Sequence, residues 1–313
     1  MPLMEKIRCA VIGVGYLGQF HAEKFAQLAN SQLVAVVDLQ RERAEKAAAQ
    51  TGAEAVTDYR EILGRVAAVS IAVPTPSHYE VAKAFLERGV HVLLEKPITS
   101  TLAEADELIG IAAAKGVVFQ VGHLERFNPV VLALDGIVRH PGFIESIRIA
   151  PFKLRGTDVS VVLDLMIHDI DIIQRIVASE VAEISSIGAP VFTEEEDIAN
   201  ARIRFANGCV ANVTASRISF KSERKMRIFQ PDAYITVDYQ NKTFAIFRKG
   251  DGEMFPGVPN VTKEERSFEQ ADPLKKEIEA FLASVATGMP PVVSGEEGRE
   301  ALATALKIIG GSR

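Results

Sequence analysis

Four polar side chains interrupt an otherwise apolar stretch at residues 161–177. They are Asp164, His168, Asp171 and Arg175. On a helix this spacing puts all four in one polar stripe, while the other faces favour burial. A histidine titrates near neutral pH and can take a proton, and a carboxylate one turn earlier can accept a hydrogen bond from a hydroxyl or from the ring. His168 and Asp164 therefore have the chemistry of a general base and its assistant.

A glycine-rich hexamer near the N-terminus points to a phosphate-bearing ligand. Residues 6–12 read as a short buried strand, and a helix continues to about Leu28. Between them lies Gly13-Val14-Gly15-Tyr16-Leu17-Gly18. In this context Gly13 permits a tight turn, Gly15 lets backbone amides approach a pyrophosphate, and Gly18 lets the helix pack closely on the strand. We expect the turn, with Tyr16 and Leu17, to bind a dinucleotide; a plain connecting turn is the alternative.

A carboxylate follows the second apolar strand at the distance expected for a dinucleotide site. The strand covers residues 33–37 and ends in Asp38. A carboxylate about 20–25 residues after the glycine turn accepts hydrogen bonds from ribose hydroxyls. It also repels the extra phosphate of NADP, so Asp38 favours NAD.

Strand and helix segments alternate from here to residue 121, which predicts a doubly wound parallel sheet. The expected helices are 41–50, 77–88 and 102–115, and the expected strands are 67–73, 90–94 and 117–121. Loops at the carboxyl ends of such strands line the ligand crevice. The candidate cofactor contacts in these loops are Pro74, Thr75, His78, Glu95 and Lys96. For His78, at the edge of a helix, a structural role is the alternative.

Lys96 follows a strand of Val and Leu and precedes Pro97, which stiffens the turn. Its ammonium could fix a hydroxyl or a carbonyl in place; a surface lysine after a strand is the alternative. Metal binding by Asp164 and His168 is the rival use of the polar stripe. No second His or Cys cluster accompanies them, and a cationic Lys96 in the same pocket would oppose a metal, so we expect none. Asp171 either supports the catalytic pair as a partner residue or is a helix residue that pairs with Arg175 at i+4, and we expect the structural role.

The pattern changes after about residue 124, which places a domain boundary there. A helix at 129–138, a strand at 143–150 and the striped helix precede a series of strands at hairpin spacing, with Asn207-Gly208 as a turn signal. The expected strands are 182–189, 198–205, 209–216, 225–229, 234–237 and 243–247. Helices at 274–286 and 294–309 close the chain. We therefore predict domains at 1–124 and 125–313, the second of α+β type on a mostly antiparallel sheet.

Composition restricts the partners. The chain of 313 residues carries a net charge of −6 without a basic cluster, which argues against nucleic acid. No apolar run approaches membrane-spanning length and the start lacks a secretory pattern, so we expect a cytoplasmic protein. Cys9 and Cys209 stand in apolar runs and should be buried thiols. The acidic run at 194–197 should be a solvated loop.

Taken together, the glycine turn, Glu95-Lys96-Pro97 and Asp164-x-x-x-His168-x-x-Asp171 resemble the Gfo/Idh/MocA oxidoreductase family. The resemblance implies an N-terminal Rossmann domain, a C-terminal domain with a large open-faced sheet, a nicotinamide bound between them, and closing helices near the junction. It also implies homodimers or homotetramers. By the same resemblance Lys96 orients the reacting hydroxyl, His168 is the general base, and Asp164 binds an adjacent hydroxyl.

Two short segments, 122–129 and 163–171, resemble the branch that oxidises the 3-hydroxyl of UDP-N-acetylglucosamine to a 3-keto sugar for lipid A precursors. The implied substrate contacts are His123, Arg126 and Asn128, with Arg126 and Asn128 alternatively a domain-linking pair. Arg155 and Arg217 are candidates for the diphosphate, with Lys221, Arg224 and Lys225 further possibilities. An inositol-type or other free-sugar dehydrogenase and a non-catalytic NAD sensor on the same fold are the alternatives.

Overall fold

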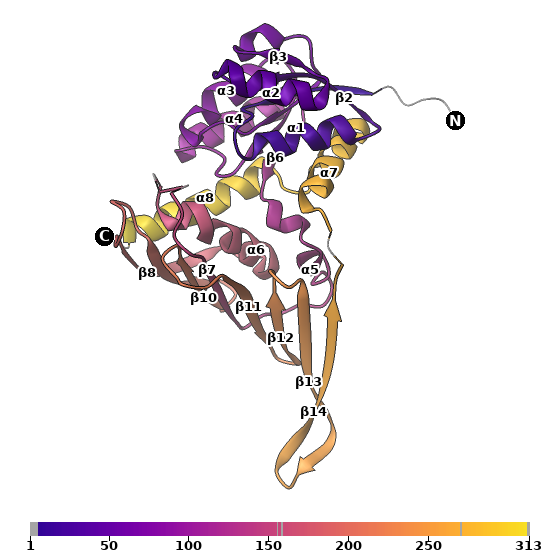
Figure 1. Ribbon diagram of the computed structural model, residues 1–313. Helices are drawn as coiled ribbons and strands as arrows, with labels where there is room; N and C mark the ends of the chain where they lie inside the picture. The colour runs from indigo at the N-terminus through magenta and orange to yellow at the C-terminus, as the bar shows by residue number, and fades with distance from the viewer. Residues whose placement is uncertain (1–5, 155, 158, 270, 312–313) are drawn as a thin grey trace. The chain divides into compact units, whose positions relative to one another are not determined.

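The structure is a computed structural model that describes residues 6–154, 156–157, 159–269 and 271–311 (Figure 1). It divides into two compact units. The first contains the chain up to Leu124 together with Asp272–Glu300, and the second contains Glu125–Ala271 together with the chain from Ala301 onward. The first break lies where the strand and helix pattern changes. Residues 272–300, expected in the second domain, instead pack in the first unit.

A six-stranded parallel sheet forms the centre of the first unit, in the order β3-β2-β1-β4-β5-β6. Its strands are β1 (Ile7–Ile12), β2 (Ser31–Val37), β3 (Glu54–Val56), β4 (Ala68–Ile71), β5 (His91–Glu95) and β6 (Phe119–Gly122). The central strands are apolar because helices cover both faces. These helices are α1 (Gly18–Gln27), α2 (Arg41–Thr51), α3 (His78–Leu86) and α4 (Leu102–Lys115), with short turns η1 (Tyr59–Ile62) and η2 (Thr75–Ser77). Strand β3, three residues long, and the turn η1 have no counterpart in the prediction.

Helix α7 (Pro273–Thr287) returns to the first unit because its apolar face fits that core. Ile278, Phe281 and Leu282 lie fully buried with Cys9 and Phe25 in one cluster. The last helix, α8 (Gly295–Gly311), begins in the first unit and ends in the second. Hydrogen bonds in both directions between Ser294 and Glu297 form a capping box at its start.

An eight-stranded sheet dominates the second unit, in the order β14-β13-β12-β11-β7-β10-β9-β8. All its pairs are antiparallel except β7 with β10. The strands are β7 (Phe143–Ile149), β8 (Val181–Ala189), β9 (Ile198–Phe205), β10 (Val210–Ser216), β11 (Glu223–Gln230), β12 (Ala233–Asp238), β13 (Thr243–Phe255) and β14 (Val258–Ser267). Gly208, with φ of +90°, makes the predicted turn between β9 and β10. The prediction lacked β14 and ended β13 too early.

Helical segments cover one face of this sheet, and the striped segment lies among them (Figure 1). It consists of a π-helical turn, η4 (Val162–Met166), followed by α6 (Ile167–Val177). Buried residues alternate along β9, β10 and β12, because only one face of the sheet is packed against this layer. The helix expected at 129–138 is much shorter: η3 (Leu124–Phe127) precedes α5 (Pro129–Leu132), and the chain then turns through Gly136, whose φ is +77°.

Both cysteines are free and buried, as predicted. Burial raises the pKa of the Cys9 thiol to about 12, so it stays protonated. Among the residues described, no helix combines the length and apolar character needed to cross a membrane.

Candidate functional site

The glycine turn has the shape that a pyrophosphate requires. Gly13 has a φ of +82°, and a Cβ there would lie 2.7 Å from the carbonyl oxygen of Ala72. A Cβ on Gly18 would lie 1.7 Å from the carbonyl oxygen of Gly13, so only glycine lets α1 begin so close to the turn. The space beside Gly15 is open, since a Cβ there would lie 3.9 Å from Nη1 of Arg43. The backbone is thus exposed at the N-terminus of α1, where an anion is favoured.

Asp38 is held against this turn by main-chain donors. Its Oδ2 accepts a hydrogen bond from the Val14 N–H at 3.0 Å, and its Oδ1 accepts one from the Gln40 N–H at 2.9 Å. Each carboxylate oxygen has a second lone pair, so both can still accept from ribose hydroxyls. The residues present therefore fit NAD at this position.

A pocket of about 230 Å³ adjoins the turn, and its lining includes two cations that were not predicted. Besides Gly15 and Tyr16 it is lined by Arg43 and Lys46 of α2. Sequence reasoning missed these cations because on a solvated helix they look like ordinary surface charges. Their place beside the turn suits the adenosine phosphate end of a dinucleotide.

Lys96 lies on a turn in which the preceding residue, Glu95, is held by hydrogen bonds inside the first unit. Glu95 accepts a hydrogen bond from the Lys96 N–H through Oε2 at 3.2 Å, and its Oε1 lies 3.1 Å from Nε2 of His21. Gly122 on the next strand makes room for this carboxyl, since a Cβ there would lie 3.2 Å from its carbon. Glu95 thus supports the turn from inside, whereas we had expected it to contact the cofactor.

His78 also supports this turn, which corrects its prediction as a cofactor contact. The side chain is 1% exposed, and its ring nitrogens lie 2.8 Å from the Pro97 carbonyl oxygen and 3.0 Å from that of Val73. Burial lowers its pKa. A neutral imidazole ring carries only one N–H, so it donates a hydrogen bond to one of these two carbonyl oxygens and not to both. Pro74 and Thr75, at the start of η2, do face outward at the carboxyl end of β4.

Asp164 and His168 lie where a π-helical turn meets an α-helix. The Ile167 N–H bonds to the Val162 carbonyl five residues back, a geometry that often marks functional sites. Asp164 and His168 are partly exposed, whereas Met166 and Ile167 between them are buried. Gly156, with φ of +72°, packs on Asp164: a Cβ there would lie 3.0 Å from Oδ2. Gly156 therefore borders the candidate assistant, Asp164.

Two buried arginine pairs anchor the helix that carries His168. Arg126 donates two hydrogen bonds to Asp171, at 2.6 and 2.8 Å, and Arg148 donates two to Asp169, at 2.7 and 3.1 Å. The predicted Asp171–Arg175 pair is wrong, since Arg175 instead bonds to Asp135. The structural role expected for Asp171 stays. Arg126 is 2% exposed, and its two hydrogen bonds to Asp171 make it part of this anchor. It is therefore not the substrate contact that we expected.

The remaining residues expected near the substrate are also largely buried. Asn128 accepts from the Val130 N–H as the cap of α5 and donates to Glu125. It is thus a structural residue of the second unit, against the prediction of a substrate contact. His123 is 1% exposed at the end of β6 in the first unit. Arg155 lies outside the described residues.

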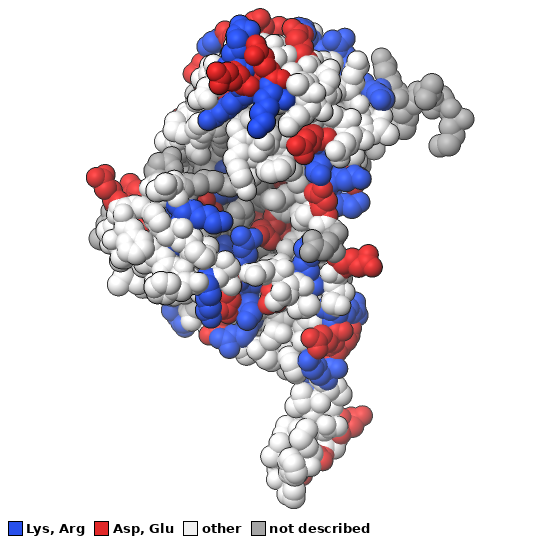
Figure 2. All heavy atoms as spheres, viewed as in Figure 1, with Lys and Arg blue, Asp and Glu red and all other residues white. Residues whose placement is uncertain are grey.

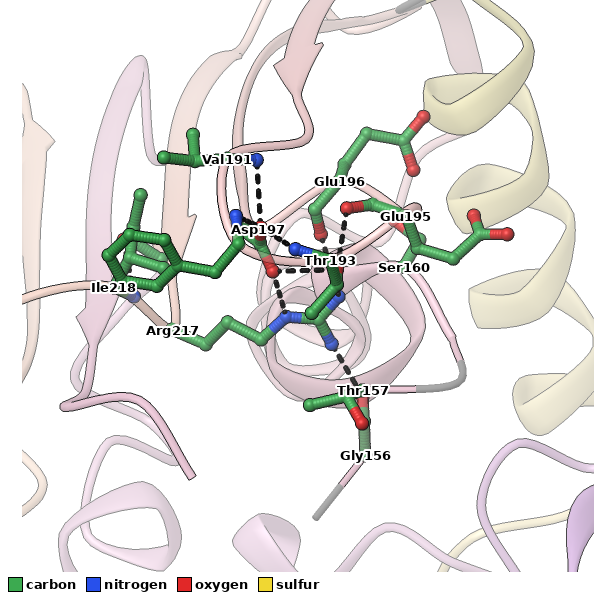
Figure 3. Close-up of polar contacts among 12 residues, drawn as sticks. Gly156, Thr157, Ser160, Val191, Thr193, Glu195, Glu196, Asp197, Arg217 and Ile218 are labelled. Carbon is green, nitrogen blue, oxygen red and sulfur yellow. Dashed lines mark hydrogen bonds and ion pairs between the residues drawn. The ribbon is translucent and has the colours of Figure 1, made fainter. Parts of the chain in front are cut away.

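Arg217 is the hub of a buried network that joins three segments (Figure 3). Nε donates to Asp197 at 2.7 Å. One terminal nitrogen donates to the Gly156 and Val159 carbonyls, and the other donates to Thr193 Oγ1 and the Glu196 carbonyl. All five N–H groups of the guanidinium are therefore used, and none is left for a diphosphate. The prediction of Arg217 as a substrate contact is corrected for this reason.

The acidic run is only partly solvated: Glu194 is exposed, but Glu196 is buried and Asp197 fully buried. The Asp197 carboxylate accepts from the main-chain N–H groups of Val191, Phe192 and Thr193 as well as from Arg217 (Figure 3). Burial alone would raise the pKa of Asp197, but these donors hold it well below its usual range.

Comparison with known proteins finds a family match in each of the two units. Residues 7–123 match the oxidoreductase family with an NAD-binding Rossmann fold, and residues 148–236 match the GFO/IDH/MocA C-terminal domain. The chain belongs to the Gfo/Idh/MocA oxidoreductase family. It is therefore an NAD-binding oxidoreductase, and the expected architecture of a Rossmann domain with a large, mostly antiparallel second sheet is confirmed.

Two relatives indicate the kind of substrate handled in this part of the family. The UDP-N-acetylglucosamine 3-dehydrogenase of Acidithiobacillus ferrooxidans is 40% identical over 306 residues, covering 97% of each chain. A solved structure of that enzyme has a TM-score of 0.93 over 98% of each chain. The myo-inositol 2-dehydrogenase of Thermotoga maritima is 28% identical, covering 95% of this chain and 93% of its own.

Proposed function

We propose that this protein oxidises the 3-hydroxyl of UDP-N-acetylglucosamine to a 3-keto sugar with NAD, in the synthesis of lipid A precursors. The observation that carries the proposal is the 40% identity, over 97% of both chains, to a dehydrogenase of that name. The glycine turn, Lys96, and the pair Asp164 and His168 supply a cofactor site, a hydroxyl-binding cation and a base.

In the proposed reaction the ammonium of Lys96 donates a hydrogen bond to the reacting hydroxyl oxygen and stabilises charge that develops there. His168 takes the hydroxyl proton, for which a neutral imidazole near neutral pH is suited. Asp164 accepts a hydrogen bond from a neighbouring sugar hydroxyl, which fixes the ring. NAD, held by the glycine turn and Asp38, supplies the acceptor for the hydride.

The proposal is tested by turnover against a sugar panel. Purified protein with NAD should form NADH with UDP-N-acetylglucosamine, and NMR should show a ketone at C3 of the product. The same assay with myo-inositol and glucose separates the free-sugar alternative. Turnover of inositol in place of the nucleotide sugar would overturn the substrate, and NAD binding without turnover of any of them would favour a sensor.

Three exposed cations become the candidates for the diphosphate once Arg217 is assigned to the loop network. Lys221, Arg224 and Lys225 lie at and just before β11, with side chains 71%, 47% and 52% exposed. Each is paired with a carboxylate, Glu223 or Glu125, in ion pairs that solvent weakens. We propose that a diphosphate competes for these cations.

We also propose that two copies of the chain associate through the face of the large sheet that α6 leaves open. A row of aromatic rings crosses this face on four adjacent strands: Phe143, Phe229, Tyr234 and Phe247. Successive ring centroids are 5.7, 4.8 and 5.4 Å apart, and every ring is partly exposed. The tip of the β13–β14 hairpin, largely uncharged in Figure 2, adds Met254, Phe255, Val258 and Val261 to the exposed apolar surface. Aromatic surface of this kind suits a protein interface.

The expected location in the cytoplasm stays a prediction. It is checked by cell fractionation with an antibody to the protein, and recovery in a periplasmic or membrane fraction would contradict it.

A further inference from the structure

Three titratable side chains converge inside the first unit, directly behind the Lys96 turn. They are His21 of α1, Glu95 at the end of β5 and Glu277 of α7, and one nitrogen or oxygen of each lies within 4.8 Å of the other two. All three come from the described part of the chain, and the side chains of His21 and Glu95 are 1% and 11% exposed. Sequence reasoning missed this cluster because α7 was placed in the other domain.

The hydrogen bonds assign a charge to Glu95. The ring of His21 lies between Ser70 Oγ, 2.8 Å from Nδ1, and the Glu95 carboxyl, 3.1 Å from Nε2. A serine hydroxyl can donate to Nδ1, which leaves Nε2–H to donate to a carboxylate. Burial would raise the pKa of Glu95, but the hydrogen bond from His21 and the charge of Lys96 hold it below its ordinary value. Glu95 is therefore the anion of the cluster.

Glu277 has no such support. It is 0% exposed, and among the described residues neither of its carboxyl oxygens has a hydrogen-bond donor. Its main-chain carbonyl accepts from Gln120, which fixes the backbone but does nothing for the carboxyl. Burial, and then the negative charge of Glu95, raise the pKa of Glu277 well above its ordinary value. Two carboxylates this close in a dry interior do not both ionise.

We propose that Glu277 is an uncharged acid at neutral pH that donates its proton in a hydrogen bond to Glu95, and thereby holds the Lys96 turn in place. The separation allows this bond after a small rotation of a side chain or through one bridging water. Glu95 then receives hydrogen bonds from His21, from the Lys96 N–H and from Glu277. Glu277 is in this sense a positioning residue, and its effect on turnover rests on the proposed function of Lys96.

A divalent cation is the other ligand that one imidazole and two carboxylates could share. It would have to remove the proton from His21 Nε2 and from Glu277. The existing contacts of His21 with Ser70 and Glu95 instead describe a complete chain of hydrogen bonds ending at the Lys96 N–H. We therefore favour a proton on Glu277 over a divalent cation at this cluster.

The direct test is infrared spectroscopy of the whole protein, with the variants Glu277→Gln, Glu277→Met and Glu279→Gln. Glu279 lies on the same helix, partly exposed and bonded to Lys276, so its variant is the matched control. Wild type and the Glu279 variant should show at pH 7 the C=O band of a protonated carboxyl, and both Glu277 variants should lack it. A wild-type band absent at pH 7, or one retained in Glu277→Gln, would overturn the proposal.

Stability against pH gives an independent readout. The raised pKa means that the folded protein holds this proton where the unfolded chain has lost it. Stability from the group is therefore complete below about pH 4.5, the ordinary value, and falls as pH rises toward the folded value. Relative to Glu277→Gln, the wild-type folding equilibrium constant should fall by up to about tenfold per pH unit in that window. Parallel curves for the two proteins would count against the proton.

Turnover separates positioning from packing. Glu277→Met keeps the bulk but not the donor, so kcat should fall about 10- to 100-fold while the KM for NAD changes little. Glu277→Gln should recover most of that loss because its amide donates to Glu95. Equal kcat in the Met and Gln variants would show that Glu277 only fills space.

Metal analysis closes the alternative. Wild type as purified, and after incubation with Zn²⁺ and dialysis, should hold no stoichiometric zinc. One equivalent of zinc that is lost in Glu277→Gln would overturn the proposal in favour of a metal site. The infrared, stability and metal measurements need no substrate. Their results therefore test the protonation of Glu277 independently of the assignment of UDP-N-acetylglucosamine.

Discussion

At the residue scale, neighbours of one chemical type on α6 have different roles because burial separates them. Asp169 and Asp171 are each 1% exposed and each is paired with an arginine, so their charges hold the helix in place. Breaking such a buried pair is costly, since it leaves an uncompensated charge. Asp164 and His168, on the same segment, are partly exposed.

Replacing the proposed base should stop the reaction but not cofactor binding. His168→Ala removes the group that takes the hydroxyl proton, so kcat should fall by about 10²- to 10⁴-fold. The dissociation constant for NAD, measured by calorimetry, should stay within error of wild type because His168 lies outside the Rossmann unit. The exposed His140 provides the control as His140→Ala. Unchanged turnover of His168→Ala would remove it from the mechanism.

A single methyl group should distinguish the glycine of the nucleotide turn from an ordinary helical glycine. Gly18→Ala places a Cβ against the Gly13 carbonyl, and we expect a loss of about 1–3 kcal/mol or more in stability, with weakened NAD binding. Gly110→Ala in α4 meets open space and should stabilise the protein by about 0.5–1 kcal/mol. Denaturant unfolding and NAD titration check both. A neutral Gly18→Ala would contradict the close packing of α1 on the turn.

At the element scale, the Arg217 network explains how irregular loops can border a site without regular structure of their own. Gly156 and Val159 before η4, the 191–197 loop after β8, and the end of β10 all meet at one guanidinium (Figure 3). Because Gly156 packs on Asp164, the network also sets the surroundings of that carboxylate.

Removing the anion of this network should cost stability in a pH-dependent way. Asp197→Asn strands a buried Arg217, and we expect a loss of about 3–5 kcal/mol near pH 7. The lowered pKa means that the stabilisation by Asp197 is complete above its unfolded value and is lost as pH falls toward the folded one. The difference between variant and wild type should therefore shrink on acidification below about pH 4.

The control for this experiment is Asp135→Asn, which breaks the exposed pair with Arg175 and should change little at any pH. Chemical denaturation from pH 2 to 8 makes the measurement. A pH-independent difference for Asp197→Asn would mean that the carboxylate charge is not what stabilises the loops.

At the scale of the whole molecule, charged side chains of both signs are dispersed over the surface, whereas exposed aromatic side chains are concentrated on one sheet. On the face viewed in Figure 2, lysine and arginine side chains are interspersed with acidic ones, as the net charge of −6 suggests. The aromatic row on the large sheet is instead continuous across four strands. A second copy of the chain is the partner that we propose for it.

Introducing a charge into the row should weaken self-association. Tyr234→Arg places a cation between Phe229 and Phe247, and we expect the dimer dissociation constant to rise about tenfold or more. Analytical ultracentrifugation measures this, and a thermal melt checks that the variant folds. Phe220→Ser, an exposed aromatic outside the row, should leave association unchanged. A wild-type protein that is monomeric at micromolar concentration would contradict the interface.

Much of the first unit is determined by local sequence. The glycine turn, Asp38 and the strand and helix alternation were predictable because tight turns, ribose contacts and parallel strands each leave a signature in consecutive residues. Asn207-Gly208 and the Ser294 capping box were predictable for the same reason. Family membership followed from three such motifs in order.

Tertiary structure decided which charged residues are buried and with whom. The sequence suggested Arg175 as the partner of Asp171, but Arg126 lies 45 positions away and holds it. Asp197 looked like a solvated charge and Arg217 like a diphosphate contact until folding brought five acceptors around one guanidinium. Glu277 meets Glu95 only because α7 returns to the first core. Pairings between distant segments leave no periodic trace in a single sequence, so the charge state of such groups is set only when the chain folds.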